Sequence, residues 1–244
     1  MIGELYAESL AGAEVDIEYE DGRREPLAAV RWLELIDGDE AMLSRCAGPT
    51  LDVGSGPGRL TVGLARRGVA VLGIDVTPHA VRLTRQAGGP ALCGDVFGHV
   101  PGAGQWATAL LADGNIGIGG DPPALLRRMR ELVRPGGELI AEVGPPGEPS
   151  TAGRVRLRHG DVTGAWFRWA GVSVSDVPPL ARESGFTVTD CREEAGRWFA
   201  YLRQECRTSA DGATEGDGKG GDGAIEGWRR GGAGDAAARG LRRV

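Results

Sequence analysis

Hydrophobic and polar positions between residues 48 and 145 alternate between short apolar runs and amphipathic stretches. The apolar runs predict strands at 49–53, 69–74, 91–93, 107–112 and 138–143. Helical spacing between these runs predicts helices at 59–67, 78–87 and 122–133. Strands that alternate with helices of this length predict a parallel sheet with right-handed crossovers.

The segments on either side follow other patterns. Apolar positions within Pro26–Cys46 have helical spacing, so residues 1–47 are predicted to form a helical extension in which Asp39 caps a second helix. After Gly144, Val155–His159 and Ala165–Trp169 predict a hairpin insert at about 154–170. A helix at 176–184 and paired strands at 186–193 and 197–203 are predicted to follow.

These patterns divide the chain into an extension at 1–47, an α/β domain at 48–206 and a tail at 207–244. The tail consists mostly of Gly, Ala, Asp and Arg. Because such a segment buries too little apolar surface to offset the entropy lost on ordering, it is predicted to be disordered.

Composition narrows the classes of function. The net charge of −6 and the lack of a dense basic block argue against a nucleic-acid partner. Four scattered cysteines with no Cys-x-x-Cys pair fit a reducing cytosol and predict no metal site. No apolar run approaches the roughly 18 residues that a membrane span needs, so a soluble cytoplasmic protein is expected.

A glycine-rich turn between the first predicted strand and its helix carries the strongest chemical signal. The sequence there is Leu-Asp-Val-Gly-Ser-Gly-Pro-Gly-Arg-Leu, from Leu51 to Leu60. Glycines let the backbone approach a ligand closely, and the following helix offers free N–H groups to a polar ligand. In a parallel sheet this turn lies at the carboxyl ends of the strands, where ligands bind.

The spacing of the glycines separates two classes of ligand. A dinucleotide-binding loop needs a third glycine at position 59, where this chain has Arg59. Gly54, Gly56 and Gly58, preceded by Asp52, instead resemble motif I of the class I methyltransferases. Together with the later matches described below, the resemblance covers about residues 48–145. It implies a seven-stranded, mostly parallel, doubly wound sheet with an antiparallel last strand.

The same resemblance implies binding of S-adenosylmethionine. The loop residues that it assigns to the amino-acid end of the cofactor are Asp52, Gly54, Ser55, Gly56 and Gly58. Asp75 ends the second strand, where an acid accepts hydrogen bonds from ribose hydroxyls, and Val76 follows it. The family uses the position of Asp95 for the adenine amino group and that of Val96 for the ring.

The segment after the fourth strand provides the catalytic candidates. In Leu111-Ala112-Asp113-Gly114-Asn115, Leu111 ends the strand at the cofactor, while Asp113 and Asn115 occupy the place that the family uses beside the reacting methyl group. The same segment gives Asp113 a second interpretation, as a loop acid that caps a turn. Leu125–Val143 resembles the family's fourth helix, Arg-Pro-Gly-Gly turn and fifth strand.

Two departures from the family pattern limit the substrate. Gln105-Trp106-Ala107 stands where the family often has an acid, and no Asn-Pro-Pro-Tyr motif supports methylation of nucleobases. A small-molecule acceptor is therefore expected, with O or N favoured over C. The candidate acceptor residues are Trp32, Arg154, Arg156, Trp166 and Arg168. A solvated hairpin face is the competing interpretation of the arginines.

Two other functions stay open at this stage. Asp75 is also compatible with an NAD-type oxidoreductase, although Arg59 argues against one. The chain can alternatively be a non-catalytic binding module that retains the methyltransferase fold. The sequence identifies neither the acceptor nor the oligomeric state.

Overall fold

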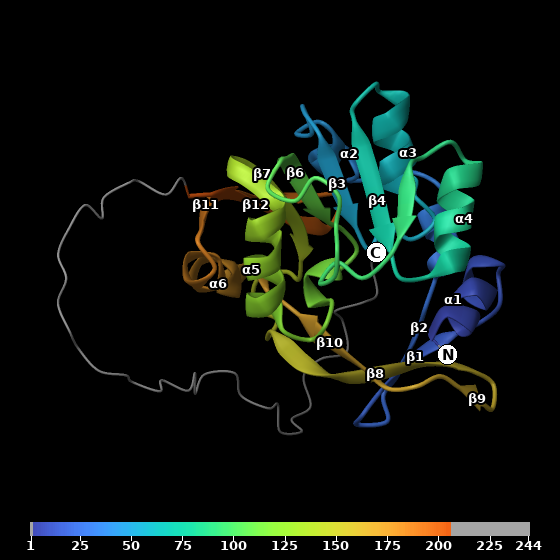
Figure 1. The fold of residues 1–244 in the computed structure, drawn as a ribbon. Helices are drawn as coiled ribbons and strands as arrows, with labels where there is room; N and C mark the ends of the chain where they lie inside the picture. Colours follow the sequence, from blue (N-terminus) through green and yellow to red (C-terminus); the bar gives the residue numbers. More distant parts are fainter. Residues whose placement is uncertain (1, 206–244) are drawn as a thin grey trace.

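A seven-stranded sheet forms the centre of the molecule. The structure is a computed structural model that describes residues 2–205, so the predicted disordered tail at 207–244 lies outside the described residues. The strand order is β11-β12-β7-β6-β3-β4-β5 (Figure 1). Neighbouring strands from β7 to β5 are parallel, whereas β12 runs antiparallel to both β11 and β7. This arrangement confirms the predicted fold class.

The predicted strands and helices of the central sheet occur close to their predicted bounds. The strands are β3 (Thr50–Val53), β4 (Val71–Asp75), β5 (Ala91–Cys93), β6 (Trp106–Leu111), β7 (Val133–Val143), β11 (Phe186–Glu194) and β12 (Arg197–Gln204). The helices are α3 (Arg59–Arg66), α4 (Pro78–Gln86), α5 (Pro122–Leu132) and α6 (Val177–Glu183). Strand β7 begins five residues earlier than predicted. The predicted Pro-Gly-Gly turn lies inside the strand as a β-bulge, where the pairing with β6 shifts register beside Trp106.

Apolar side chains on both faces of this sheet build the core. One cluster joins α5 and α6 to the sheet through residues such as Leu125, Met129 and Leu180. On the opposite face, Met42, Leu64 and Phe199 belong to a second cluster, which joins α2 (Glu40–Leu43) and α3 to the sheet. Because both faces are covered, the central strands place apolar side chains on both faces, as in other parallel sheets.

The N-terminal extension differs from the prediction. Only α1 (Ile2–Leu10), a short 3₁₀ turn at Ala29–Leu33 and α2 are helical, whereas β1 (Asp16–Tyr19) and β2 (Arg24–Pro26) form a hairpin. The 3₁₀ turn and α2 lie within the stretch predicted to be helical, whereas the hairpin of β1 and β2 corrects the prediction of a helical extension. The polar and apolar residues of Asp16–Tyr19 alternate with the period of a strand, so the signal was present in the sequence.

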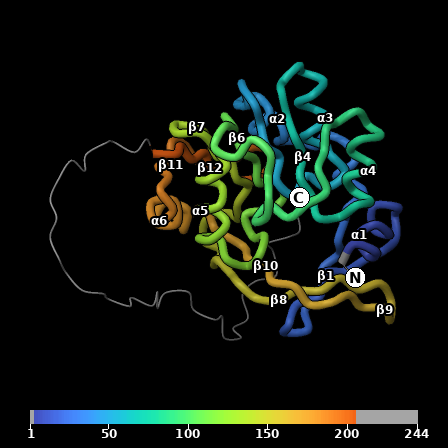
Figure 2. Tube along the Cα trace, viewed as in Figure 1, coloured from blue at the N-terminus to red at the C-terminus, as the bar shows by residue number. Residues whose placement is uncertain are grey.

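This hairpin pairs with the insert after β7 to make a second sheet. The predicted insert hairpin is confirmed as β8 (Thr151–His159), β9 (Val162–Thr163) and β10 (Phe167–Gly171). Strand β8 pairs on its other edge with β1, which gives the order β10-β8-β1-β2. Helix α1 contacts both β8 and α4, so it joins the second sheet to the main domain (Figure 2).

Candidate functional site

The glycine turn lies where β3 meets α3, at the carboxyl edge of the sheet. Gly54, Gly56 and Gly58 all have positive φ, at 68°, 53° and 92°. Side chains rarely adopt such angles, so glycine is required for this path of the backbone. A Cβ at Gly58 would also overlap the Thr84 side chain, whose Oγ1 would lie 2.6 Å away. The turn is therefore pressed against α4 with no room for a side chain.

Two side chains fasten this turn from outside. Asn115 Nδ2 donates to the carbonyl oxygens of Val53 and Gly54, each at 3.0 Å. Thr84 Oγ1 lies 3.0 Å from the Gly56 carbonyl oxygen, to which it donates. Asn115 was predicted to be a catalytic residue, whereas no pattern in the sequence indicated Thr84. Their contacts make both of them positioning residues for the turn.

Asp75 lies directly beside the glycine turn. Its Oδ2 accepts from the Gly56 backbone N–H at 2.9 Å, and its Oδ1 accepts from Thr77 N–H at 2.7 Å. Burial raises the pKa of Asp75, whereas the backbone hydrogen bonds from Thr77 and Gly56 oppose the rise. Asp95 follows β5, which pairs in parallel with β4. Both acids therefore lie at the same edge of the sheet as the turn.

The apolar residues near Asp95 are arranged differently from the prediction. Val96 is only 5% exposed and belongs to the main core, so its side chain is not available to a ligand ring as predicted. Its neighbour Phe97 is 42% exposed and Val76 is 64% exposed. These two are the exposed apolar side chains next to Asp95 and Asp75. Leu111, like Val96, is fully buried in the main core.

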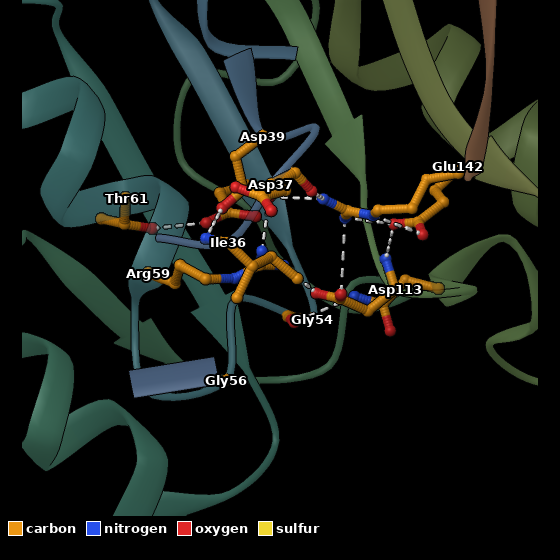
Figure 3. Close-up of polar contacts among 12 residues, drawn as sticks. Ile36, Asp37, Asp39, Gly54, Gly56, Arg59, Thr61, Asp113 and Glu142 are labelled. Carbon is orange, nitrogen blue, oxygen red and sulfur yellow. Dashed lines mark hydrogen bonds and ion pairs between the residues drawn. The ribbon is translucent and has the colours of Figure 1, made fainter. Parts of the chain in front are cut away.

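A buried group of charged side chains lies next to the turn (Figure 3). It contains two guanidinium groups and three carboxylates, those of Arg59, Arg197, Asp39, Asp113 and Glu142. Arg59 pairs with Asp39 and lies 2.5 Å from Asp113 Oδ2. Arg197 Nη1 lies 2.8 Å from Asp39, and its Nη2 lies 2.7 Å from Glu142. We call these five residues the buried charge network.

The network changes the roles predicted for three residues. Asp39 does not cap α2 through its side chain, because its carboxylate binds both guanidiniums and the Ile36 N–H. The Arg59 guanidinium can be buried at the start of α3 because Asp39 and Asp113 neutralise its charge. Asp113 is held by Arg59, and its own N–H donates to Glu142. Burial raises the pKa of Asp113, and the charge of Arg59 opposes the rise.

Asp52 is fully enclosed beneath the glycine turn. Its Oδ2 accepts from Thr61 Oγ1 at 2.7 Å, and burial raises its pKa to about 6. The side chain therefore connects β3 to α3 inside the domain. The Asp52 carboxyl would therefore not contact a ligand bound on the glycine turn directly.

Tyr6 of α1 covers the turn and was missed by the sequence analysis. A Cβ at Gly56 would lie 2.9 Å from Tyr6 Oη, and the Tyr6 ring is 6.1 Å from that of Trp32. Burial raises the pKa of Tyr6, and the charges of Asp75 and Asp113 add to the rise. An aromatic residue in a short N-terminal helix gives no sequence signal for this position, because the contact spans 50 residues of chain.

The arginine candidates lie on the second sheet, and Arg168 packs against Gly120 in the loop after β6. Arg156 and Arg158 hold Glu18, and their hydrogen bonds lower its pKa to about 2. Arg154 binds Glu20, while the Arg156 guanidinium lies over the Trp166 ring at 4.6 Å. Arg168 opposes Arg154 in the neighbouring strand. Glu18 and Glu20 thus neutralise Arg154 and Arg156, two of the three arginines predicted to bind an anion.

The residues around the turn fit a polar nucleoside ligand. Ser55 Oγ and Asp113 Oδ1 are buried without a hydrogen-bond partner among residues 2–205, although Arg197 Nη2 is 3.6 Å from the latter. Buried polar atoms of this kind call for a partner such as a ligand or water. Within the same residues, no group of three or more His, Cys, Asp or Glu side chains could hold a metal ion. No helix in that range is long and apolar enough to cross a membrane.

Comparisons with known proteins agree with this geometry. Residues 51–141 match the family described as a methyltransferase domain. A search of curated protein sequences found no match. Among solved structures, a SAM-dependent methyltransferase from Bacteroides fragilis in complex with S-adenosyl-L-homocysteine has a TM-score of 0.70 at 20% identity, over 84% of this chain and 94% of that chain.

Two further solved structures share the fold at a greater distance. The 1,6-didemethyltoxoflavin-N1-methyltransferase of Burkholderia thailandensis has a TM-score of 0.51 at 20% identity, over 68% of this chain and 74% of that one. The glycopeptide N-methyltransferase MtfA has a TM-score of 0.51 at 17% identity, over 68% and 85%. Residues 51–141 of the present chain are thus similar to a methyltransferase domain, and the chain shares the fold of S-adenosylmethionine-dependent methyltransferases of known structure.

Proposed function

We propose that the protein transfers a methyl group from S-adenosylmethionine to a small-molecule acceptor through nitrogen or oxygen. The contact between Asp75 Oδ2 and the Gly56 N–H, at 2.9 Å, carries this proposal. It brings a sugar-binding carboxylate and a glycine turn to one point at the carboxyl edge of the sheet. The names of two proteins with the same fold, a toxoflavin-precursor N1-methyltransferase and a glycopeptide N-methyltransferase, support including nitrogen as the acceptor atom.

Each part of the cofactor has candidate partners. The turn from Gly54 to Gly58 would hold its amino-acid end, with Ser55 Oγ as a free polar atom. Asp75 would accept from the ribose hydroxyls, and Asp95 would take the adenine amino group. Val76 and Phe97, which are both exposed, are better candidates for the adenine ring than the buried Val96.

When bound, S-adenosylmethionine supplies an electrophilic methyl group on a sulfonium sulfur, so positioning of the acceptor dominates catalysis. Tyr6, with the Trp32 ring beside its own, covers the glycine turn and would exclude water from it. In this proposal, the loop that contains Asp113 and Asn115 would lie beside the reacting atoms. Since Arg59 holds the Asp113 carboxylate, we assign Asp113 to positioning rather than to removal of a proton from the acceptor.

Calorimetric titration with S-adenosylhomocysteine tests the cofactor site. The wild type should bind, whereas Asp75→Ala and Gly56→Val should lose most of the affinity. Asp161→Ala, in an exposed turn, controls for the loss of a carboxylate. Gly68→Val controls for a side chain at positive φ, because nothing lies within 4 Å of a Cβ at Gly68. Unchanged binding in both Asp75→Ala and Gly56→Val would reject the site.

The two competing functions have distinct signatures in solution. An NAD-type oxidoreductase would enhance NADH fluorescence, and S-adenosylhomocysteine would not displace the nucleotide. A non-catalytic module would bind S-adenosylhomocysteine yet methylate no acceptor. Either result would replace the proposal.

A further inference from the structure

A cavity of about 300 Å³ opens at the amino edge of the central sheet. The charged residues that line it are Arg45, Arg134, Glu138 and Arg203, and the other lining residues are one threonine and four alanines or glycines. The volume is at the lower end of the roughly 300–1,000 Å³ that is usual for small-molecule sites.

The cavity and the glycine turn lie at opposite edges of the sheet. Gly48 precedes β3, and Thr108 is near the start of β6. Arg203 is near the end of β12, which runs antiparallel to β7, so it lies at the same edge. The glycine turn instead follows the other end of β3. A ligand in this cavity would therefore be neither the cofactor nor the methyl acceptor.

The pairing of three strands aligns polar side chains at this edge. Thr108 of β6 is the register partner of Glu138 in β7, and Glu138 is the partner of Arg203 in β12. Residues in register place their side chains on the same face of a sheet. Arg45 follows α2 and reaches this row, because its Nη2 lies 3.1 Å from Glu138 Oε1 and its guanidinium lies over the Tyr201 ring at 4.5 Å.

The charges around the cavity do not balance. Glu138 compensates Arg45, with which it is paired. Arg134 and Arg203 are exposed, and within residues 2–205 their guanidinium groups make no ion pair or hydrogen bond. The cavity thus has a net charge of +2 in a chain whose net charge is −6. Because like charges at one cavity repel each other, an anion bound between the two arginines would be stabilised.

Small residues form the remaining walls and keep them close together. A Cβ at Gly48 would lie 2.9 Å from the Cβ of Ala107, so the segment before β3 packs directly on β6. The Ala107 N–H also donates to the Pro49 carbonyl oxygen at 2.8 Å. The walls are therefore in place before a ligand binds, which limits the entropy lost on binding.

A phosphate monoester matches the cavity in charge and in hydrogen bonding. It carries about −1.5 to −2 charge at pH 7, whereas a single carboxylate would compensate only one of the two arginines. Guanidinium groups bind phosphate oxygens through two parallel N–H···O bonds.

We propose that this cavity is a second ligand site, which binds a small molecule bearing a phosphate monoester through Arg134 and Arg203. The proposal does not depend on the proposed methyltransferase function, because the site shares no residue with the glycine turn or with Asp75 and Asp95.

Ligand-observed ³¹P NMR on the full-length protein at pH 8 tests the proposal. The probe is phenyl phosphate, a dianion at this pH, and methyl phenyl phosphate has the same ring with a single negative charge. Phenyl phosphate should bind about tenfold more tightly than methyl phenyl phosphate. S-adenosylhomocysteine should not displace phenyl phosphate, since its proposed site lies at the other edge of the sheet.

Substitution of the two unpaired arginines assigns the binding to this cavity. Arg134→Gln and Arg203→Gln should each weaken phenyl phosphate binding about five- to tenfold, and the double variant should lose the preference for the dianion. The double variant with Lys at both positions should retain part of the preference, because the charge remains without the planar fork. Arg24→Gln combined with Arg66→Gln is the control, with the same change of net charge at two other exposed arginines. The Tm of every variant should stay close to that of the wild type, because all four positions are exposed.

Four outcomes would overturn the proposal. The first two are no binding of phenyl phosphate to the wild type and equal binding of the dianion and the monoanion. The third is an equal loss in the Arg134→Gln, Arg203→Gln variant and in the control variant, which would show that only the overall charge matters. The fourth is displacement of phenyl phosphate by S-adenosylhomocysteine, which would place the probe in the cofactor site.

Discussion

Arg59→Met isolates the contribution of the buried charge network to stability. The substitution retains an unbranched side chain of similar length but removes a guanidinium that is 3% exposed and binds both Asp39 and Asp113. Three carboxylates then share the single guanidinium of Arg197. Removal of one partner from a buried ion pair usually costs about 3–5 kcal/mol, because the remaining charge is left without compensation.

The helix dipole predicts a change of the opposite sign. Arg59 lies in the first turn of α3, where a positive charge is unfavourable by about 0.3–1 kcal/mol, so its loss should slightly stabilise the helix. The network term is several times larger and should dominate. For a domain of this size, a net loss of about 3–5 kcal/mol lowers Tm by roughly 6–20 °C.

Urea unfolding followed by circular dichroism measures the effect, with Arg66→Met as the control. Arg66 lies on the same helix but is exposed, so its loss should change the free energy of unfolding by less than about 0.5 kcal/mol. A result for Arg59→Met that equals the result for Arg66→Met would refute a stabilising role for the network.

The pH dependence of Arg59→Met provides a second check. In the variant, the charge of Arg59 no longer opposes the effect of burial on Asp113, so the folded-state pKa of Asp113 rises further above its unfolded value. Such a group destabilises the folded state at high pH, and this penalty disappears as pH falls below its ordinary pKa near 4. The gap in stability between wild type and variant should therefore narrow from pH 8 to pH 5. A gap that is constant or widens would show that burial of charge is not its cause.

Three further predictions follow from individual contacts. Burial raises the pKa of Asp52 to about 6, so ionisation of this carboxyl destabilises the folded wild type at high pH. The free energy of unfolding of Asp52→Asn should therefore increase by up to about 3 kcal/mol relative to that of the wild type as pH rises from 4 to 8. Urea titrations at both pH values measure this difference, and a difference that does not depend on pH contradicts the prediction. Gly58→Ala should destabilise the protein by about 1–3 kcal/mol more than Gly88→Ala, since φ is similar (92° and 89°) but only Gly58 faces Thr84; equal thermal shifts would rule out the steric effect. Asn115→Leu leaves the Val53 and Gly54 carbonyls without a donor and should weaken S-adenosylhomocysteine binding about tenfold or more by calorimetry, whereas unchanged affinity would show that the turn holds its shape unaided.

The sequence by itself determined the order of strands and helices around the central sheet and the chemistry of the glycine turn. Periodicity is a local property, and the spacing of Gly54, Gly56 and Gly58 needs only a few residues to specify a backbone path. The position of Asp75 followed as well, because parallel strands end at a common edge.

The tertiary structure alone decided which charges are neutralised and which remain available. Asp39, Arg59 and Arg197 carry no sequence signal for one another, since their contacts span 20 and 158 residues of chain. In the same way, β1 pairs with β8, and the contact between Glu18 and Arg156 spans 138 residues of chain. Glu18 and Glu20 thereby neutralise Arg154, Arg156 and Arg158. The strength of a charge depends on its burial and partners, so pairing across the fold decides which of these arginines are neutralised.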